Sequence, residues 1–164
     1  MLRQWDDVDS VFMKTLPFIV IACVALILGV VLYLADHQRA TAIRALAGRL
    51  RFHYIGDALP LSLSLRGTPF DGVSKVWNVI DGECHKTRVI VFDCRIGSGK
   101  GSWRRTVIAA ETDADIFGVV HFDRDLTVER SGDWMLLYEP KAVSLIPPSL
   151  MSVDEIEAHL NAIP

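Results

Sequence analysis

The sequence has few cysteines, no excess of basic residues, and no repeat or low-complexity segment. Its three cysteines in 164 residues are not clustered, so neither a disulfide framework nor a CxxC-type zinc site is indicated. The 17 basic and 20 acidic residues give a net charge of −3, which does not suggest nucleic-acid binding. We therefore expect neither a metal ion nor nucleic acid among its ligands.

Motifs that carry known chemistry are also missing. There is no GxSxG elbow for a nucleophile and no HxxxH pair for a metal. The segment 97–102 (GSGKGS) is similar to a phosphate-binding loop, but Cys94 stands where the motif needs glycine and Gly101 where it needs serine or threonine. The sequence predicts a hairpin loop here, and it predicts no catalytic, cofactor-binding or metal-ligating residues.

Asp93 is the acidic residue that lies within an apolar strand pattern, and two interpretations of it stay open. In the first, it is a partly buried carboxylate with a raised pKa, and an enzyme site would then lie around Asp93, His85 or His121. Alternatively it has a structural role, hydrogen-bonded at a sheet edge or paired with Arg95, Arg104 or Arg105. We favour the structural role. The sequence assigns no role to Cys84 or Cys94.

Charged residues are absent from Leu16–Ala35, a stretch of twenty residues rich in Leu, Ile and Val. Twenty helical residues extend roughly 30 Å, the hydrocarbon thickness of a bilayer. The pattern predicts a transmembrane helix with Pro17 in its first turn, where a missing N–H costs little. Tyr33 and Phe18 are suitable anchors at the two interfaces.

A cleaved signal peptide is the competing interpretation of this stretch. It fits poorly, because Asp6, Asp7 and Asp9 occupy a leader that should be positively charged and the apolar run is too long. We expect the segment to stay attached. Two basic residues precede the span and four follow it, which favours a cytoplasmic C-terminal domain at the cell (inner) membrane.

The segment 36–51 (DHQRATAIRALAGRLR) predicts a juxtamembrane helix that prolongs the span. Its apolar face comprises Ala40, Ile43, Leu46, Ala47 and Leu50. Four arginines flank that face and are candidate contacts for anionic lipid: Arg39, Arg44, Arg49 and Arg51. We favour the alternative, in which these arginines are solvated at the edge of the helix and set the orientation of the span as basic residues on its cytoplasmic side.

The predicted partners are the lipid bilayer and a protein of unknown identity. Ala25 and Gly29 form a small-xxx-small pair in the span that would allow two helices to approach closely, so a homodimer is one further hypothesis.

The remaining residues predict one soluble domain. The expected organisation is a tail (1–15), the transmembrane helix (16–35), the juxtamembrane helix (36–51) and the domain (52–164). Alternation at 59–65 predicts a strand or extended edge, and the segments 76–80 and 88–94 predict strands joined through Asp81-Gly82. The second is nearly continuous in Val, Ile and Phe, so it should be central. Further strands are expected at 103–110, 116–122, 126–129 and 134–138.

Ser152 and Glu155 form a capping-box pattern that predicts a helix ending near Asn161, with Val153, Ile156 and Leu160 on its apolar side. A helix, then mainly antiparallel strands, then a helix indicate an α+β fold.

Four segments resemble a motif pattern, NV.G…VFD…GxGK…TV, of an uncharacterised bacterial protein family. They are 78–82, 89–93, 97–107 and 132–138, with Cys94 where the family has an aromatic residue. Members of that family have an N-terminal hydrophobic segment and a small α+β domain. The resemblance implies the domain boundaries and supplies no activity.

Two function classes stay open. The first is a non-catalytic binding module tethered to the membrane. The second is a small membrane-tethered hydrolase or other enzyme whose site assembles only in three dimensions.

Overall fold

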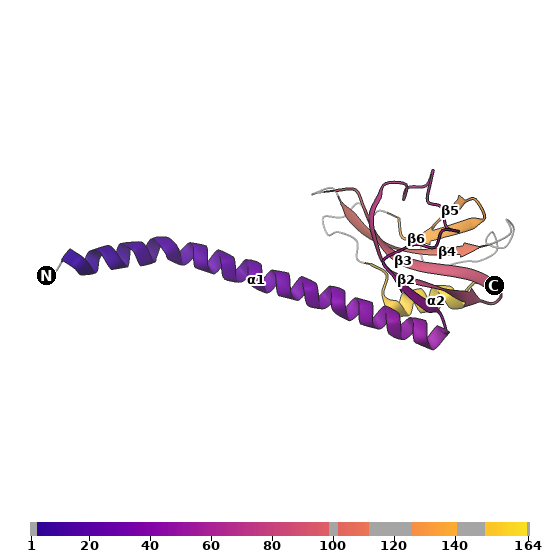
Figure 1. The fold of residues 1–164 in the computed structure, drawn as a ribbon, viewed down its shortest axis with the longest axis horizontal. Coiled ribbons are helices and arrows are strands. Elements are labelled where there is room, and N and C mark those ends of the chain that lie inside the picture. The colour runs from indigo at the N-terminus through magenta and orange to yellow at the C-terminus, as the bar shows by residue number, and fades with distance from the viewer. Residues whose placement is uncertain (1–2, 99–101, 112–125, 141–149, 164) are drawn as a thin grey trace. The chain divides into compact units, whose positions relative to one another are not determined.

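The computed structural model describes residues 3–98, 102–111, 126–140 and 150–163. The chain divides into two compact units, Met1–Thr41 and Ala42–Pro164. The first unit contains most of the long helix α1 (Arg3–Leu50), and the last turns of α1 belong to the second unit. The fold is α+β, as the element order predicted: a long apolar helix, a six-stranded antiparallel sheet and a C-terminal helix (Figure 1).

The apolar part of α1 is long and apolar enough to cross a membrane. Within Pro17–Leu50, the most apolar window of 18 residues has a mean hydropathy of 3.0, and none of it is buried. The expectation that Pro17 lies in the first turn is wrong, because the helix begins fourteen residues earlier, at Arg3. An interior proline leaves one carbonyl without its helical donor, which membrane helices tolerate better than exposed soluble ones.

The sheet contains six strands in the order β1-β2-β3-β4-β6-β5, and every neighbouring pair is antiparallel. Their bounds are β1 His53–Gly56, β2 Val73–Cys84, β3 Thr87–Ile96, β4 Trp103–Glu111, β5 Thr127–Ser131 and β6 Trp134–Tyr138. The prediction that β3 is central and well buried is confirmed, since Val89–Cys94 is buried throughout. The strand expected at 116–122 lies outside the described residues.

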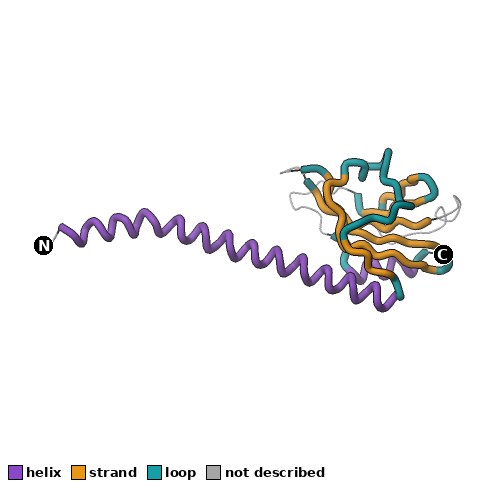
Figure 2. The backbone as a smooth tube through the Cα atoms, in the orientation of Figure 1, coloured by secondary structure: helices purple, strands orange, loops and turns teal. Residues whose placement is uncertain are grey.

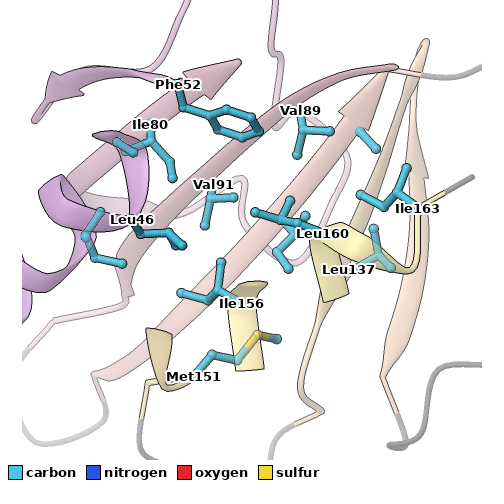
Figure 3. Close-up of a cluster of buried hydrophobic side chains, with 14 residues drawn as sticks. Leu46, Phe52, Ile80, Val89, Val91, Leu137, Met151, Ile156, Leu160 and Ile163 are labelled. Atoms are coloured by element: carbon cyan, nitrogen blue, oxygen red, sulfur yellow. The ribbon is translucent and has the colours of Figure 1, made fainter. Parts of the chain in front are cut away.

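One face of the sheet is covered by helices. The last turns of α1 contribute Ile43, Leu46 and Ala47, and α2 (Val153–Asn161) contributes Ile156 and Leu160. The side chains of Leu46, Ile156 and Leu160 point toward the sheet, which contributes Ile80, Val89, Val91 and Leu137 to the same cluster (Figure 3). Of the apolar face expected for the juxtamembrane helix, Ile43, Leu46 and Ala47 are buried in this cluster and Leu50 packs against it. Because this core begins at Ile43, the end of α1 is part of the domain.

The opposite face is covered by a loop. The segment 57–72 forms no strand, so of the strand or extended edge predicted at 59–65 the strand is wrong (Figure 2). Its buried side chains, Leu63 and Phe70, pack on Phe92, Trp134 and Tyr138. The alternating leucines thus reflect a coil that lies on an apolar sheet face, since Pro60 and two turns interrupt any ladder pairing.

The strands β2 and β3 are longer than the sequence indicated. Asp81 and Gly82, predicted to join them, lie inside β2, and the connecting turn is His85-Lys86. Both turn residues have positive φ (49° and 72°), as a two-residue type I′ hairpin requires. Gly82 instead accommodates Phe52, whose ring would lie 2.2 Å from a Cβ at this position. Glycine is present at this position because the Phe52 ring packs against the backbone, and not because the chain turns here.

Helix α2 begins as predicted. The Ser152 hydroxyl accepts from the Glu155 amide, and the Glu155 carboxylate accepts from the Ser152 amide, so the capping box is confirmed. Ile156 and Leu160 are buried and Val153 is partly buried.

Candidate functional site

A polar network lies on the helix-covered face of the sheet, around Asp93 in the central strand β3. Asp93 is 1% exposed, and its two carboxyl oxygens accept hydrogen bonds from the Thr106 hydroxyl (2.8 Å) and the Asn78 amide (2.9 Å). The donors come from the two strands that flank β3. Asp93 is hydrogen-bonded, as the favoured interpretation predicted, but it lies in a central strand and not at a sheet edge. Its structural role stays a prediction.

Asn78 reaches Asp93 because β2 contains a bulge. The pairing passes from Trp77 opposite Asp93 to Ile80 opposite Val91, so β2 carries an extra residue here. Asn78 has φ 54°, a left-handed conformation that asparagine tolerates better than most residues. Its side-chain oxygen accepts from the Tyr54 hydroxyl at 3.4 Å, so the network extends from β1 to β4.

Three basic residues lie in one row beside this network. Lys75 pairs with Arg95, and Arg95 pairs with Arg104, so neighbouring strands place the three side chains on one face. We call these three residues the basic row. Lys75 and Arg95 are exposed and Arg104 is partly buried. Trp77 lies on the same face, with the Arg104 guanidinium 4.9 Å and the Lys75 ammonium 5.9 Å from its ring centre.

The network also reaches the end of α1. The Arg44 guanidinium lies 4.7 Å from the centre of the Tyr54 ring. Arg44 therefore contacts Tyr54, which bonds to Asn78, which bonds to Asp93. Asp93 is two residues from Arg95 on the same face of β3. A chain of side-chain contacts thus connects Arg44 of α1 to Asp93, the neighbour of the basic row on β3.

The four arginines predicted as lipid contacts have different surroundings. Arg39 belongs to the first unit and the other three to the second. Arg44 stacks on Tyr54, Arg49 forms an ion pair with Glu157 of α2, and Arg51 is exposed with φ 60° just after the helix. The ion pair with Glu157 gives Arg49 a role inside the domain.

Arg105 lies on the other face of the sheet and is 1% exposed. Its guanidinium lies 4.9 Å from the Trp103 ring centre and donates to the Pro140 carbonyl at 3.0 Å, whereas Nε and Nη1 have no hydrogen-bond partner among the residues that the structure describes. Burial lowers the pKa of Arg105.

Cys94, which pairs with Arg105, has its pKa raised to about 12 by burial and then by the nearby Asp93 charge. A thiol with this pKa is a poor nucleophile. Burial also raises the pKa of Cys84, whose thiol donates to the Leu160 carbonyl at 3.2 Å and so connects β2 to the end of α2. Burial therefore favours the protonated thiol at both cysteines.

Of the three residues named in the enzyme hypothesis, the structure describes Asp93 and His85, and these two lie far apart. His85 is exposed in the turn at one end of the β2–β3 hairpin, and Asp93 lies six residues beyond the first residue of β3. At about 3.4 Å per residue, that separation is roughly 20 Å along the strand. His121 lies outside the described residues. Among the residues that are described, no group of three or more His, Cys, Asp or Glu side chains is placed to hold a metal.

Sequence reasoning missed the basic row. Arg95 and Arg104 were considered only as partners of Asp93, and Lys75 was not singled out. The available signal was the alternation along β3, which places Asp93 and Arg95 on one face. The pairing of Lys75 and Arg104 with Arg95 depends on strand register, which the sequence does not display.

Comparisons of the chain with protein-family models, with curated proteins and with solved structures give no match. The family resemblance of the sequence motifs stays a prediction.

Proposed function

We propose that the chain is a single-pass protein of the bacterial cell (inner) membrane, and that its α+β domain is a non-catalytic binding module at the cytoplasmic surface. The observation that carries this proposal is the apolar part of α1, whose most apolar window is entirely unburied. Thirteen large apolar side chains between Phe18 and Leu34 are at least 49% exposed.

A helix with this much exposed apolar surface is more stable in lipid than in water. Each exposed apolar Å² costs about 25 cal/mol in water, so thirteen unburied side chains amount to a large unfavourable free energy. An amphipathic surface helix would bury one stripe and expose polar residues, whereas this segment is apolar all round. The bilayer supplies the missing apolar surroundings.

Chain length keeps the domain close to the membrane. Ile43, the first core residue, is eight residues beyond Ala35. Eight fully extended residues span at most roughly 28 Å, so the domain stays within that distance of the end of the span. The larger number of basic residues after the span supports a cytoplasmic domain.

The surroundings of the chemically active groups support a binding module over an enzyme. Both oxygens of Asp93 accept hydrogen bonds from side chains of neighbouring strands, and burial keeps the Cys94 thiol protonated. By contrast, Lys75 and Arg95 are exposed and available to a partner at the surface.

The proposal is tested by fractionating cells that express the full-length chain. We expect it in the membrane pellet after an alkaline carbonate wash and in solution after detergent. Leu26→Arg places a charge within the span, which costs roughly 3 kcal/mol at a helix centre, and should move the chain out of the pellet. The matched control is Leu61→Arg, at a fully exposed leucine of the domain. A wild-type chain found in the supernatant, with its N-terminus intact, would refute the anchor.

The side of the membrane is tested separately. Protease added to intact spheroplasts should leave the domain whole, and protease added after lysis should degrade it. Cleavage of the domain in intact spheroplasts would place it outside the cytoplasm.

A further inference from the structure

The basic row carries like charges at positions where they repel one another. Lys75, Arg95 and Arg104 are directly paired across three adjacent strands, and like charges in such pairs destabilise a sheet. The neighbouring Asp93 carboxyl group offsets part of this charge, while Arg44 adds to it through its contact with Tyr54. The chain as a whole has a net charge of −3, so the positive charge is local.

We propose that the basic row binds the anionic phospholipid headgroups of the membrane in which the chain is anchored. This inference rests on the proposed function, because the anchor is what keeps the domain near that surface. Charge complementarity is the first argument: basic residues close to an anionic leaflet are attracted to it, about fivefold in affinity for each residue.

Position is the second argument. Membrane attraction decays within about one Debye length, roughly 8 Å at physiological ionic strength, so the interacting residues must lie on the side of the domain that faces the lipid. Side-chain contacts connect Arg44 through Tyr54 and Asn78 to Asp93, which lies two residues from Arg95 on the same face of β3. The tether of eight residues ends at Ile43, next to Arg44 at the start of this series of contacts.

The aromatic neighbour is the third argument. Trp77 is partly buried and lies between two cations of the basic row. Tryptophan favours the headgroup region, where its ring is partly apolar and its N–H can meet water or lipid. The combination of the Trp77 ring with the cations of the basic row is therefore expected to favour the headgroup region of a bilayer over bulk water.

The test uses the full-length chain held in solution by a non-ionic amphipathic polymer, which satisfies the anchor without supplying a lipid surface that would cover the basic row. Binding of this complex to separate vesicles, made of phosphatidylcholine with or without phosphatidylglycerol, is measured by flotation at low and high salt. We expect binding only to the vesicles that contain phosphatidylglycerol, and weaker binding at high salt.

The variant Lys75→Gln/Arg95→Gln should bind about thirtyfold more weakly, because two charges are lost. The matched control is Arg66→Gln/Lys86→Gln, which removes two exposed charges from the 57–72 loop and the β2–β3 turn and should change binding by less than about twofold. The first variant should unfold at a temperature no lower than wild type, since it removes like-charge repulsion. A loss of binding is then not a loss of folding.

Equal weakening by the two variants would show that only overall charge matters and would overturn the inference. So would equal binding to both kinds of vesicle. Efficient competition by soluble glycerol phosphate would assign the basic row to a free phosphate ligand in place of a membrane. A chain that stays soluble without the polymer would overturn the proposed function itself, which is a different failure.

Discussion

At the residue scale, Asp93 shows how the sheet satisfies a buried carboxyl group. A buried acidic group costs several kcal/mol unless hydrogen bonds compensate for the lost water. Here Asn78 and Thr106 donate to separate oxygens from opposite sides of β3. The bulge in β2 and the left-handed backbone of Asn78 are the local cost of bringing one of those donors into position.

We predict that Asp93→Asn destabilises the domain by about 1–3 kcal/mol, because an amide nitrogen would face one of two donors and leave it unpaired. The measurement is urea unfolding followed by far-UV circular dichroism. Asp133→Asn, at an exposed residue of the β5–β6 turn, is the matched control and should be nearly neutral. An Asp93→Asn variant as stable as wild type would mean that the network contributes nothing to folding.

Gly82 provides a second residue-scale prediction. Its Cβ would lie 2.2 Å from Cδ1 and 2.3 Å from Cγ of Phe52, atoms near the stem of a buried side chain. We expect Gly82→Ala to destabilise the domain by about 1–3 kcal/mol through overpacking. Gly72→Ala, where a Cβ would meet nothing within 4 Å, is the control.

Phe52 provides a direct check on that explanation. In a Phe52→Ala background the space above Gly82 is open, so Gly82→Ala should cost much less than it does in wild type. If the two substitutions prove additive, the steric explanation is wrong.

At the scale of elements, the helix α2 is defined by local chemistry that the sequence displays. Ser152 and Glu155 satisfy two free amides reciprocally at its first turn. We predict that Ser152→Ala lowers the free energy of unfolding by about 1 kcal/mol. Glu155→Gln keeps the reciprocal hydrogen bond and should cost less. Thermal unfolding of both variants measures the difference, and a Ser152→Ala variant as stable as wild type would show that the cap contributes nothing.

Elements that depend on local properties could be predicted from the sequence. Periodicity and capping are local, and they indicate the end of α1, the strands β3, β4 and β6, and the helix α2. The strand at 59–65 was predicted wrongly because alternating leucines occur both in a strand and in a coil that lies on an apolar face. The turn at Gly82 was predicted wrongly because glycine occurs both in turns and where another side chain packs closely against the backbone.

The candidate site was less predictable than the fold for a physical reason. A hydrogen bond from Asn78 to Asp93 needs a bulge, and the basic row needs the pairing of three strands. Both depend on contacts between residues far apart in the chain. Periodicity indicates which face a side chain occupies within its strand and does not indicate which residue lies beside it on the next strand.

At the scale of the whole molecule, the folded domain is self-contained from Ala42 onward. Both of its hydrophobic clusters use only residues from Ile43 to Ile163. The stability of this unit therefore reflects groups buried inside it. Two of these groups, the Cys94 thiol and the Tyr138 hydroxyl, titrate at alkaline pH.

Their pKa values give the stability of the domain a defined pH dependence. Burial is the main cause that raises the pKa of Cys94 from 9.0 to about 12, and burial with the hydrogen bond to Glu129 raises that of Tyr138 from 10.0 to about 12. Between about pH 9 and pH 12 the unfolded chain has lost protons that the native state keeps. The native state then binds more protons, so its stability falls as the pH rises. Cys84, whose pKa burial also raises, adds a change of the same sign.

We predict that the urea midpoint falls steadily above about pH 9, with each group contributing at most about 1.4 kcal/mol per pH unit. Cys94→Ala should reduce the slope from about pH 9 upward, where a thiol of the unfolded chain is half ionised. Tyr138→Phe should have its main effect about one pH unit higher, because a tyrosine of the unfolded chain is half ionised near pH 10. Because the slope is compared and not the absolute stability, a cavity left by either substitution does not confuse the result. Identical slopes in wild type and both variants would show that neither group keeps its proton in the native state.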